Sequence, residues 1–284
     1  VQGALTNRVA ITNAITVQSV NGPDATAIVG AWDPVSTNGD AAVRCVYLGT
    51  GAVLGGFTLT NGATRNAGTE YDTYGGGLCG EGGATATNCI ITGNSAGLGG
   101  GGAHYGTLWN CILADNTAGI GGGGGAAWSA LGNCVLSRNS AYVGGGAVFS
   151  TLVNCLLSGN SAMGGGGAAE CILNNCTISG NFASSSCGGA AGGTLNNCVA
   201  YYNIASDRRE VCSATLRHTC TPDQGDGFIT NAPLFRDPAA DLQLRGDSPC
   251  VNAGDNALAA AGVDLAGNPR ILNGTVDLGA FEYA

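Results

Sequence analysis

Lysine is absent from this chain of 284 residues, and all ten basic residues are arginine. Charged residues make up 10% of the sequence, whereas an average soluble domain has about 25%. The net charge of −9 argues against nucleic acid and against an anionic membrane surface as partners. No apolar run reaches the ~18 residues that a membrane-spanning helix needs, so we expect no membrane insertion.

Proline is also scarce, with 7 residues, but glycine is abundant, with 51. Glycine costs about 1 kcal/mol at a helix position relative to alanine, which excludes a predominantly helical protein. The lack of a strict Gly-X-Y period excludes a collagen triple helix. The glycines instead gather in short runs at regular intervals, at 75–77, 99–102, 121–125, 144–146 and 164–167.

A repeat of 21 to 23 residues explains this spacing. Each of its six copies contains an Asn-Cys pair, with another Asn five residues after the Cys. In five copies a Leu stands two residues before the pair. This agreement indicates one structural unit used repeatedly. The pairs are Asn88 and Cys89, Asn110 and Cys111, Asn133 and Cys134, Asn154 and Cys155, Asn175 and Cys176, and Asn197 and Cys198.

The apolar pattern within each copy predicts two short strands joined at a corner. The alternation of side chains slips by one residue at the Asn-Cys pair. Such a slip requires a bend, and Asn is the non-glycine residue that best tolerates a left-handed conformation there. A period of ~20–30 residues with short strands predicts an all-β fold, a single-stranded parallel β-helix or solenoid. A leucine-rich repeat is excluded because its Leu-x-x-Leu-x-Leu frame is missing.

The composition divides the chain into two regions. We assign residues 1–206 to the β-helix, with clear repeats over 75–203 and strand-like segments before them. At ~4.8 Å per coil, we expect a rod of about eight or nine coils. Six of the ten Arg, nine of the 14 Asp and five of the 7 Pro lie from residue 207 onward. We therefore expect residues 207–284 to form an extension that packs on the rod and caps it.

Two family resemblances agree with this division. Gly-Gly-Gly-Ala followed by Asn-Cys-x-Leu-x-x-Asn resembles the β-helix repeats of secreted bacterial surface proteins, of the polymorphic outer-membrane and adhesin type. Ala-Pro-Leu-Phe at 232–235, Ser-Pro-Cys-Val-Asn-Ala-Gly-Asp at 248–255 and Val-Asp-Leu-Gly-Ala-Phe-Glu at 276–282 resemble the choice-of-anchor Q region that follows such β-helices. The usual Ile-Asp-Ala-Gly of that region is Val-Asn-Ala-Gly here, at 251–254. The resemblances imply export and a right-handed coil, but no activity.

Thirteen cysteines leave at least one thiol unpaired in a monomer. The six repeat cysteines share one phase, so we expect an inward column of reduced, buried thiols. Parallel side chains hold their Cβ atoms too far apart for disulfides, and a one-dimensional column cannot form a tetrahedral metal site. Other cysteines should pair if the protein is exported. Cys220 with Cys250 is the first choice, because this bond would join two halves of the extension, and Cys212 with Cys220 is the alternative.

An enzyme must be considered because many β-helices cleave polysaccharides. Glycoside hydrolysis needs two carboxylates about 5–10 Å apart, and no two acidic residues of the repeats recur at matching phase. A lyase needs a basic proton acceptor, but Arg138 is the only basic residue apart from histidine between Arg65 and Arg208. His104 is expected at the surface rather than as a general base. We therefore predict no catalytic residues, having considered Glu70, Asp72, Glu81, Asp115 and Glu170.

The densest group of acidic and amide side chains lies in the extension. Asp255, Asp264 and Asp277, with Asn256 and Asn268, could offer oxygen ligands to Ca²⁺. The simpler interpretation is that they form turns in a glycine-containing segment. Calcium is thus the one candidate cofactor, and we expect none to be required.

One column of aromatic residues is a candidate binding surface. Tyr105, Trp128 and Phe149 each stand five residues before the Asn of a repeat, and Glu170 follows in the next copy. An outward-facing column would form a strip suited to stacking on sugar rings or on a partner. If a corner separates it from the Leu column, the same residues belong to the core. The glutamate in the series favours the outward orientation.

These observations predict a secreted or cell-surface β-solenoid with a non-catalytic structural or adhesive role. Terminal coils present unpaired strand edges, so end-to-end self-association into fibres is expected, with other surface proteins or polysaccharide as further partners. The alternative is a carbohydrate-active enzyme, a polysaccharide lyase or glycoside hydrolase, or a polysaccharide-binding module that uses the aromatic strip.

Overall fold

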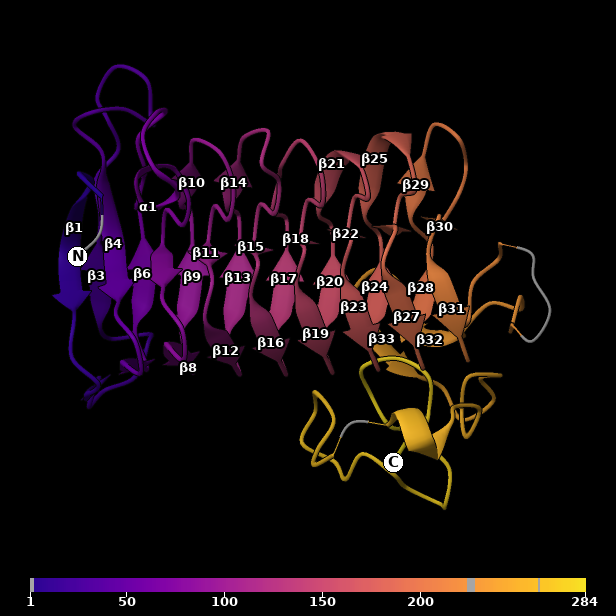
Figure 1. Ribbon diagram of the computed structural model, residues 1–284. Helices are drawn as coiled ribbons and strands as arrows, with labels where there is room; N and C mark the ends of the chain where they lie inside the picture. The colour runs from indigo at the N-terminus through magenta and orange to yellow at the C-terminus, as the bar shows by residue number, and fades with distance from the viewer. Residues whose placement is uncertain (1–2, 224–227, 260) are drawn as a thin grey trace.

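The computed structural model describes residues 3–223, 228–259 and 261–284, and these form a parallel β-solenoid (Figure 1). Three parallel sheets run along a rod. The N-terminal segment forms one end of this rod, and the C-terminal segment folds against the side of the rod at its other end. The predicted all-β β-helix is confirmed. No helix in the described residues is long and apolar enough to cross a membrane.

The three sheets are built from short strands, each contributed by a different coil. The first sheet contains β1 (Thr6–Ile11), β4 (Val43–Leu48), β7 (Leu78–Gly80), β11 (Ala103–His104), β15 (Ala126–Ala127), β18 (Ala147–Val148), β22 (Ala168–Ala169), β26 (Ala190–Ala191) and β30 (Val211–Cys212). The second contains β2 (Thr16–Gln18), β5 (Val53–Gly55), β8 (Thr85–Thr87), β12 (Thr107–Trp109), β16 (Ala130–Gly132), β19 (Thr151–Val153), β23 (Ile172–Asn174), β27 (Thr194–Asn196) and β31 (Thr215–Arg217). The third contains β3 (Ala27–Val29), β6 (Thr58–Thr60), β9 (Ile90–Thr92), β13 (Ile112–Ala114), β17 (Val135–Ser137), β20 (Leu156–Ser158), β24 (Thr177–Ser179) and β28 (Val199–Tyr201).

Smaller elements lie outside these sheets. A four-residue helix, α1 (Glu70–Thr73), interrupts one loop, and a 3-10 turn, η1 (Asn256–Leu258), lies in the extension. The remaining strands are β10 (Ser95–Ala96) paired with β14 (Thr117–Ala118), β21 (Ser161–Gly164), β25 (Phe182–Ser186) and β29 (Ile204–Ala205) in a three-stranded sheet, and the antiparallel pair β32 (Phe235–Asp237) and β33 (Asp241–Leu244).

The core is a set of columns in which like residues stack from coil to coil. Leu108, Leu131 and Leu152 are in register on the inner side of the second sheet and at most 2% exposed. Small residues such as Ala103 and Ala126 take the matching place on the first sheet. Each fully buried Leu contributes about 2 kcal/mol, so the repeat itself supplies the apolar interior.

The Asn of every Asn-Cys pair forms the corner between the second and third sheets. Its φ lies between 50° and 53° in all six copies, which is the left-handed region that most residues avoid. The corner reverses the side-chain phase, so that Leu108 before it and Cys111 after it both point into the core. The sequence signal and the backbone conformation therefore agree.

The second Asn of each repeat forms a buried amide ladder, a role that sequence analysis did not identify. Asn139 Nδ2 donates to Asn160 Oδ1 at 2.9 Å, and Asn116 Nδ2 donates to Asn139 Oδ1 at 3.0 Å. At the C-terminal end of the ladder, Asn203 Nδ2 donates to Glu210 Oε2 at 2.6 Å. Burial raises the pKa of Glu210 to about 7. Each coil is thus tied to the next by side chains as well as by backbone.

The repeat cysteines form an inward column of free, buried thiols. The Sγ of Cys134, for example, lies 3.2 Å from the carbonyl oxygen of Gly132 and 3.5 Å from that of Leu108. Burial raises the pKa of the Cys134 thiol well above its ordinary value. These side chains therefore act as small apolar residues with a weak S–H donor.

The solenoid extends past the boundary expected at residue 207. Strands β30 and β31 pair with β26 and β27, and Cys220 still bridges to Val199. The extension proper therefore begins after Cys220. It then runs back along the side of the rod: Asn154 Nδ2 donates to the Val263 carbonyl at 2.9 Å, and the Ala280 N–H donates to Thr177 Oγ1 at 2.9 Å.

The disulfide predictions need correction. The structure joins Cys187 to Cys212, with their Cα atoms 5.6 Å apart. The Cys212–Cys220 pairing is therefore wrong, since Cys212 is bonded to a residue of the neighbouring coil. Cys220 and Cys250 are free thiols buried in one apolar cluster, so the first-choice bond is not present either. Because Cys220 belongs to the last coil, the pair lies between coil and extension rather than between two halves of the extension.

Candidate functional site

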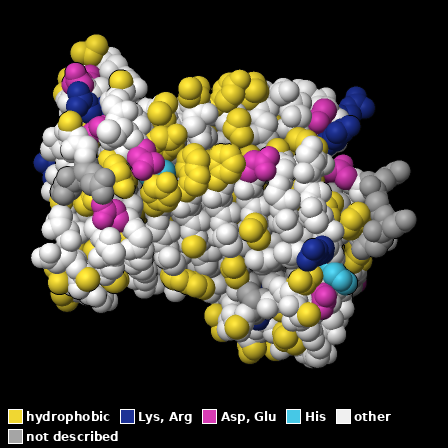
Figure 2. Space-filling model, in the orientation of Figure 1, with side chains coloured by type: hydrophobic (Ala, Val, Ile, Leu, Met, Phe, Trp, Pro, Cys, Tyr) yellow, Lys and Arg dark blue, Asp and Glu magenta, His cyan; other side chains and the backbone are white. Residues whose placement is uncertain are grey.

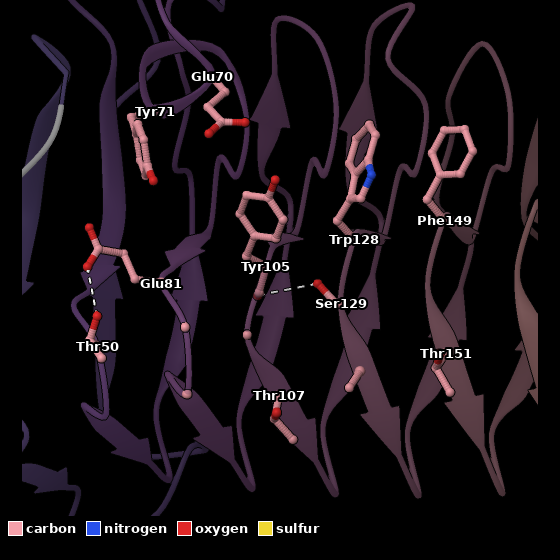
Figure 3. A pocket seen from close by; sticks show the side chains of 14 residues that line it. Thr50, Glu70, Tyr71, Glu81, Tyr105, Thr107, Trp128, Ser129, Phe149 and Thr151 are labelled. Atoms are coloured by element: carbon pink, nitrogen blue, oxygen red, sulfur yellow. Dashed lines mark hydrogen bonds between the residues drawn. The ribbon is translucent and has the colours of Figure 1, made fainter.

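A groove of about 780 Å³ follows the corner between the first and second sheets (Figure 3). Tyr105, Trp128 and Phe149 form one wall, each from a successive coil. Thr107 and Ala130, on the outer face of the second sheet, belong to its floor, which continues to Thr151. The groove therefore runs parallel to the rod and crosses several coils.

The aromatic column occupies a strained corner of the backbone. The φ values of Tyr105, Trp128 and Phe149 are 55°, 50° and 47°, in the left-handed region that is unusual for bulky residues. This conformation turns the side chains outward: Phe149 is 50% exposed, and Tyr105 and Trp128 are partly exposed. The rings of Trp128 and Phe149 stack with centroids 5.0 Å apart. Figure 2 shows hydrophobic side chains along this corner as a band with an acidic side chain at each end.

His104 lies beneath the aromatic wall, contrary to its expected surface position. It is 1% exposed, and its ring centroid is 4.1 Å from that of Tyr105 and 4.6 Å from that of Tyr74. Burial lowers the pKa of His104 to about 3, so the ring is neutral. Neither ring nitrogen has a hydrogen-bond partner in the described part of the chain. The matching positions in the next coils are Ala127 and Val148. Both side chains are smaller than an imidazole, so His104 fills more of the space beneath the wall than its equivalents do.

Two glutamates close the N-terminal end of the groove. Glu70 comes from α1, and Glu81 comes from the turn that follows β7. The Glu81 carboxylate accepts hydrogen bonds from the hydroxyls of Tyr47 and Thr50, the latter at 3.2 Å. Burial and the nearby Glu70 raise the pKa of Tyr105. No arginine lines this groove among the described residues, so its charge is negative.

Sequence analysis considered both glutamates but did not bring them together. They lie on either side of the glycine run 75–77, and that loop returns the chain to the same corner. The short separation of Glu70 and Glu81 across one loop is therefore the sequence signal that could have indicated their meeting. The test of matching phase in successive copies does not apply to them, because both residues belong to a single coil.

The predicted calcium ligands serve as hydrogen-bond acceptors within the extension. Asp264 accepts from the N–H groups of Asn268 and Glu282, both at 2.7 Å. Asp277 accepts from two other backbone N–H groups, and Asp255 caps η1. In the described ranges, the one group of three metal-ligating atoms within 4.8 Å of one another is Cys187, Asp207 and Cys212, of which the cysteines form the disulfide. The three aspartates are therefore not assembled as a metal site.

Comparisons with known proteins support the fold. No family model and no curated protein matches the chain. Among solved structures, it is similar to the crystal structure of pectate lyase Pel9A, with a TM-score of 0.52 and 14% identity over 100% of this chain and 84% of that chain. At this identity the likeness shows the fold alone. The chain is thus a parallel β-solenoid of the pectate lyase-like β-helix type.

Proposed function

We propose that this protein is a non-catalytic, adhesive β-solenoid that binds a neutral polysaccharide in the groove. The observation that carries the proposal is the outward aromatic column of Tyr105, Trp128 and Phe149 along one wall. Exposed aromatic side chains in a concave site are typical of binding surfaces. The three aromatic residues occupy equivalent left-handed corner positions in successive coils, so their side chains line the same groove.

The two sides of the groove suit the two kinds of surface on a sugar ring. Aromatic faces on the wall can stack on the C–H face of a pyranose. Hydroxyl groups on the floor, such as those of Thr107 and Thr151, can exchange hydrogen bonds with sugar hydroxyls. Because the groove follows the rod axis, it suits a linear chain of sugars rather than a single compact molecule.

The charge of the groove favours a neutral ligand. Glu70 and Glu81 are the charged residues in its lining, and the whole chain has a net charge of −9. An acidic polysaccharide would be repelled at the Glu end and would find no basic partner there. The proposal therefore departs from the substrate in the name of the structural neighbour.

Affinity electrophoresis and calorimetry test this proposal directly. We expect binding to galactomannan or mixed-linkage β-glucan, and none to polygalacturonate or alginate. Trp128→Ala should weaken the neutral interaction about tenfold or more, as for a buried hot-spot aromatic residue. Trp32→Ala is the control, because Trp32 is 48% exposed but is not part of the groove lining. Equal affinities of the two variants would contradict the proposal.

The enzyme alternative is favoured by one observation, the presence of two carboxylates at one end of the groove. A reducing-end assay on the bound polysaccharide, with and without calcium, decides between the two functions. Release of reducing ends that Glu70→Gln or Glu81→Gln abolishes would establish a glycoside hydrolase. A lyase can act only on a uronic acid chain, because elimination removes the proton next to the C5 carboxyl group; calcium-dependent formation of an unsaturated chain end from polygalacturonate or alginate would establish a lyase.

We also propose an extracellular or cell-surface location, with end-to-end association of rods. The disulfide between Cys187 and Cys212 suits an oxidising compartment. Within the described residues, β1, β2 and β3 each pair on one side only, with β4, β5 and β6, which leaves strand edges for a second copy. Electron microscopy at high protein concentration should show end-to-end filaments, and single rods only would contradict the association.

A further inference from the structure

A second aromatic surface lies on the outer face of the second sheet, beside the groove floor. Trp109 ends strand β12, two residues after Thr107, and its indole is 44% exposed. In register with Trp109 on the neighbouring strands are Thr87 and Gly132. A large exposed ring thus stands next to a residue without a side chain.

The ring of Trp109 lies with its face against the backbone of Gly132. A Cβ atom built on Gly132 would be 2.2, 2.4 and 2.5 Å from Cζ3, Cε3 and Cη2 of the indole. These three atoms are adjacent in the six-membered ring. Because their distances from the Cβ position are nearly equal, the Cα–Cβ bond of a residue at position 132 would point at the face of the ring and not at its edge. The opposite face is therefore turned to solvent, and the glycine is what allows the ring to lie flat.

Trp109 and Tyr105 stand on opposite sides of the groove floor. Thr107 lies between them in the sequence and contributes to the floor. Thr107 and Trp109 point to the same side of one strand, ~6.6 Å apart at ~3.3 Å per residue. A sugar over Thr107 thus has the aromatic wall on one side and the flat indole on the other.

We infer that Trp109, seated on Gly132, is a second stacking platform that holds a further sugar unit of a neutral polysaccharide bound in the groove. This inference rests on the function proposed above and adds a subsite to it. Trp109 lies across the floor from the wall in the same coil as Tyr105, so a sugar chain that runs along the groove meets the wall with one edge and the platform with the other. Loss of Trp109 should therefore weaken binding of a chain that covers Thr107.

Calorimetry with cellohexaose and mannohexaose tests the inference. Trp109→Ala should weaken hexaose binding about tenfold, as expected for loss of one stacking contact. Gly132→Ala should have the same effect with the tryptophan retained, because the new Cβ displaces the ring. Thr87→Ala is the matched control in the same column and should leave hexaose binding unchanged.

Fluorine NMR of protein labelled with 5-fluorotryptophan gives a second readout. The Trp109 signal should shift when hexaose is added, while the signal of Trp32 stays constant. If Trp128→Ala weakens hexaose binding but Trp109→Ala and Gly132→Ala do not, the platform is refuted and the groove proposal stands. If the hexaoses do not bind, or Trp128→Ala has no effect, both are refuted. If Trp109→Ala alters self-association in sedimentation without altering hexaose binding, the exposed indole serves a protein contact and the inference is overturned.

Discussion

Replacement of Asn139 by alanine tests how much the amide ladder stabilises the rod. The Asn139 side chain is fully buried and takes part in four hydrogen bonds. Its Nδ2 donates to the Leu113 carbonyl at 2.8 Å and to Asn160 Oδ1 at 2.9 Å. Its Oδ1 accepts from the backbone N–H and the side-chain Nδ2 of Asn116, both at 3.0 Å.

Asn139→Ala removes these four bonds at once. Each net hydrogen bond contributes about 1 kcal/mol, and a buried group left without a partner costs about 1–3 kcal/mol. The backbone N–H of Asn116 loses its acceptor in a place that water does not reach. We therefore expect the free energy of unfolding to fall by about 4 kcal/mol or more.

Urea unfolding followed by circular dichroism measures this loss. The control is Asn133→Ala, at the corner of the same coil, where φ is 50° and the expected loss is the left-handed penalty of about 1–2 kcal/mol. The two changes delete the same atoms, and because Asn133→Ala also carries the left-handed penalty, the excess loss for Asn139→Ala is a lower limit on the contribution of the ladder. A loss for Asn139→Ala no larger than that for Asn133→Ala would refute the ladder as a source of stability.

Three further predictions concern titration, thiols and strain. Burial raises the pKa of Glu210 from 4.5 to about 7, so the folded state binds the carboxyl proton more tightly than the unfolded state does. The stability that comes from this tighter proton binding is complete below pH 4.5 and is lost as the pH rises to about 7. Glu210→Gln should therefore melt at a higher temperature than the wild type at pH 8 and at a similar temperature at pH 4; equal melting temperatures at pH 8 would contradict this. Unreduced, denatured protein should expose eleven reactive thiols, and nine would mean that Cys220 and Cys250 had bonded. Glu170 has a φ of 52°, so Glu170→Gly should raise the free energy of unfolding by about 1 kcal/mol, and a decrease in urea midpoint would count against backbone strain there.

The solenoid could be predicted from sequence because its determinants are local. A corner at Asn110 depends on residues within a few positions of it, and the same local pattern recurs in each copy. Register then follows, since a slip of one residue would expose Leu108 and bury its neighbours. The sequence marks Asn116 and its equivalents as positions of the repeat, but it does not indicate which group each buried amide binds.

The extension and the site could not be predicted in the same way. The extension has no internal period, so nothing in its sequence indicates that Val263 lies against Asn154 and Ala280 against Thr177, in coils far earlier in the chain. The meeting of Glu70 with Glu81 depends on the path of one irregular loop that contains α1. The burial of His104 was in principle readable, because its place in the repeat corresponds to Ala127 and Val148.

The candidate site is found where the repeat is broken. Positions that maintain the coil must carry similar residues in every copy, because each stacks on its equivalents above and below. A residue that differs from its column is free of this requirement and is available for another role. His104 replaces small residues, Trp109 stands beside Gly132, and Glu81 lies in a turn that is longer than the equivalent turns of the coils that follow. His104 and Glu81 lie near the corner where Tyr105 begins the wall, whereas Trp109 lies across the groove floor from that wall. The clustering of these departures on a scaffold that otherwise repeats is a reason, independent of the groove itself, to place the binding function there.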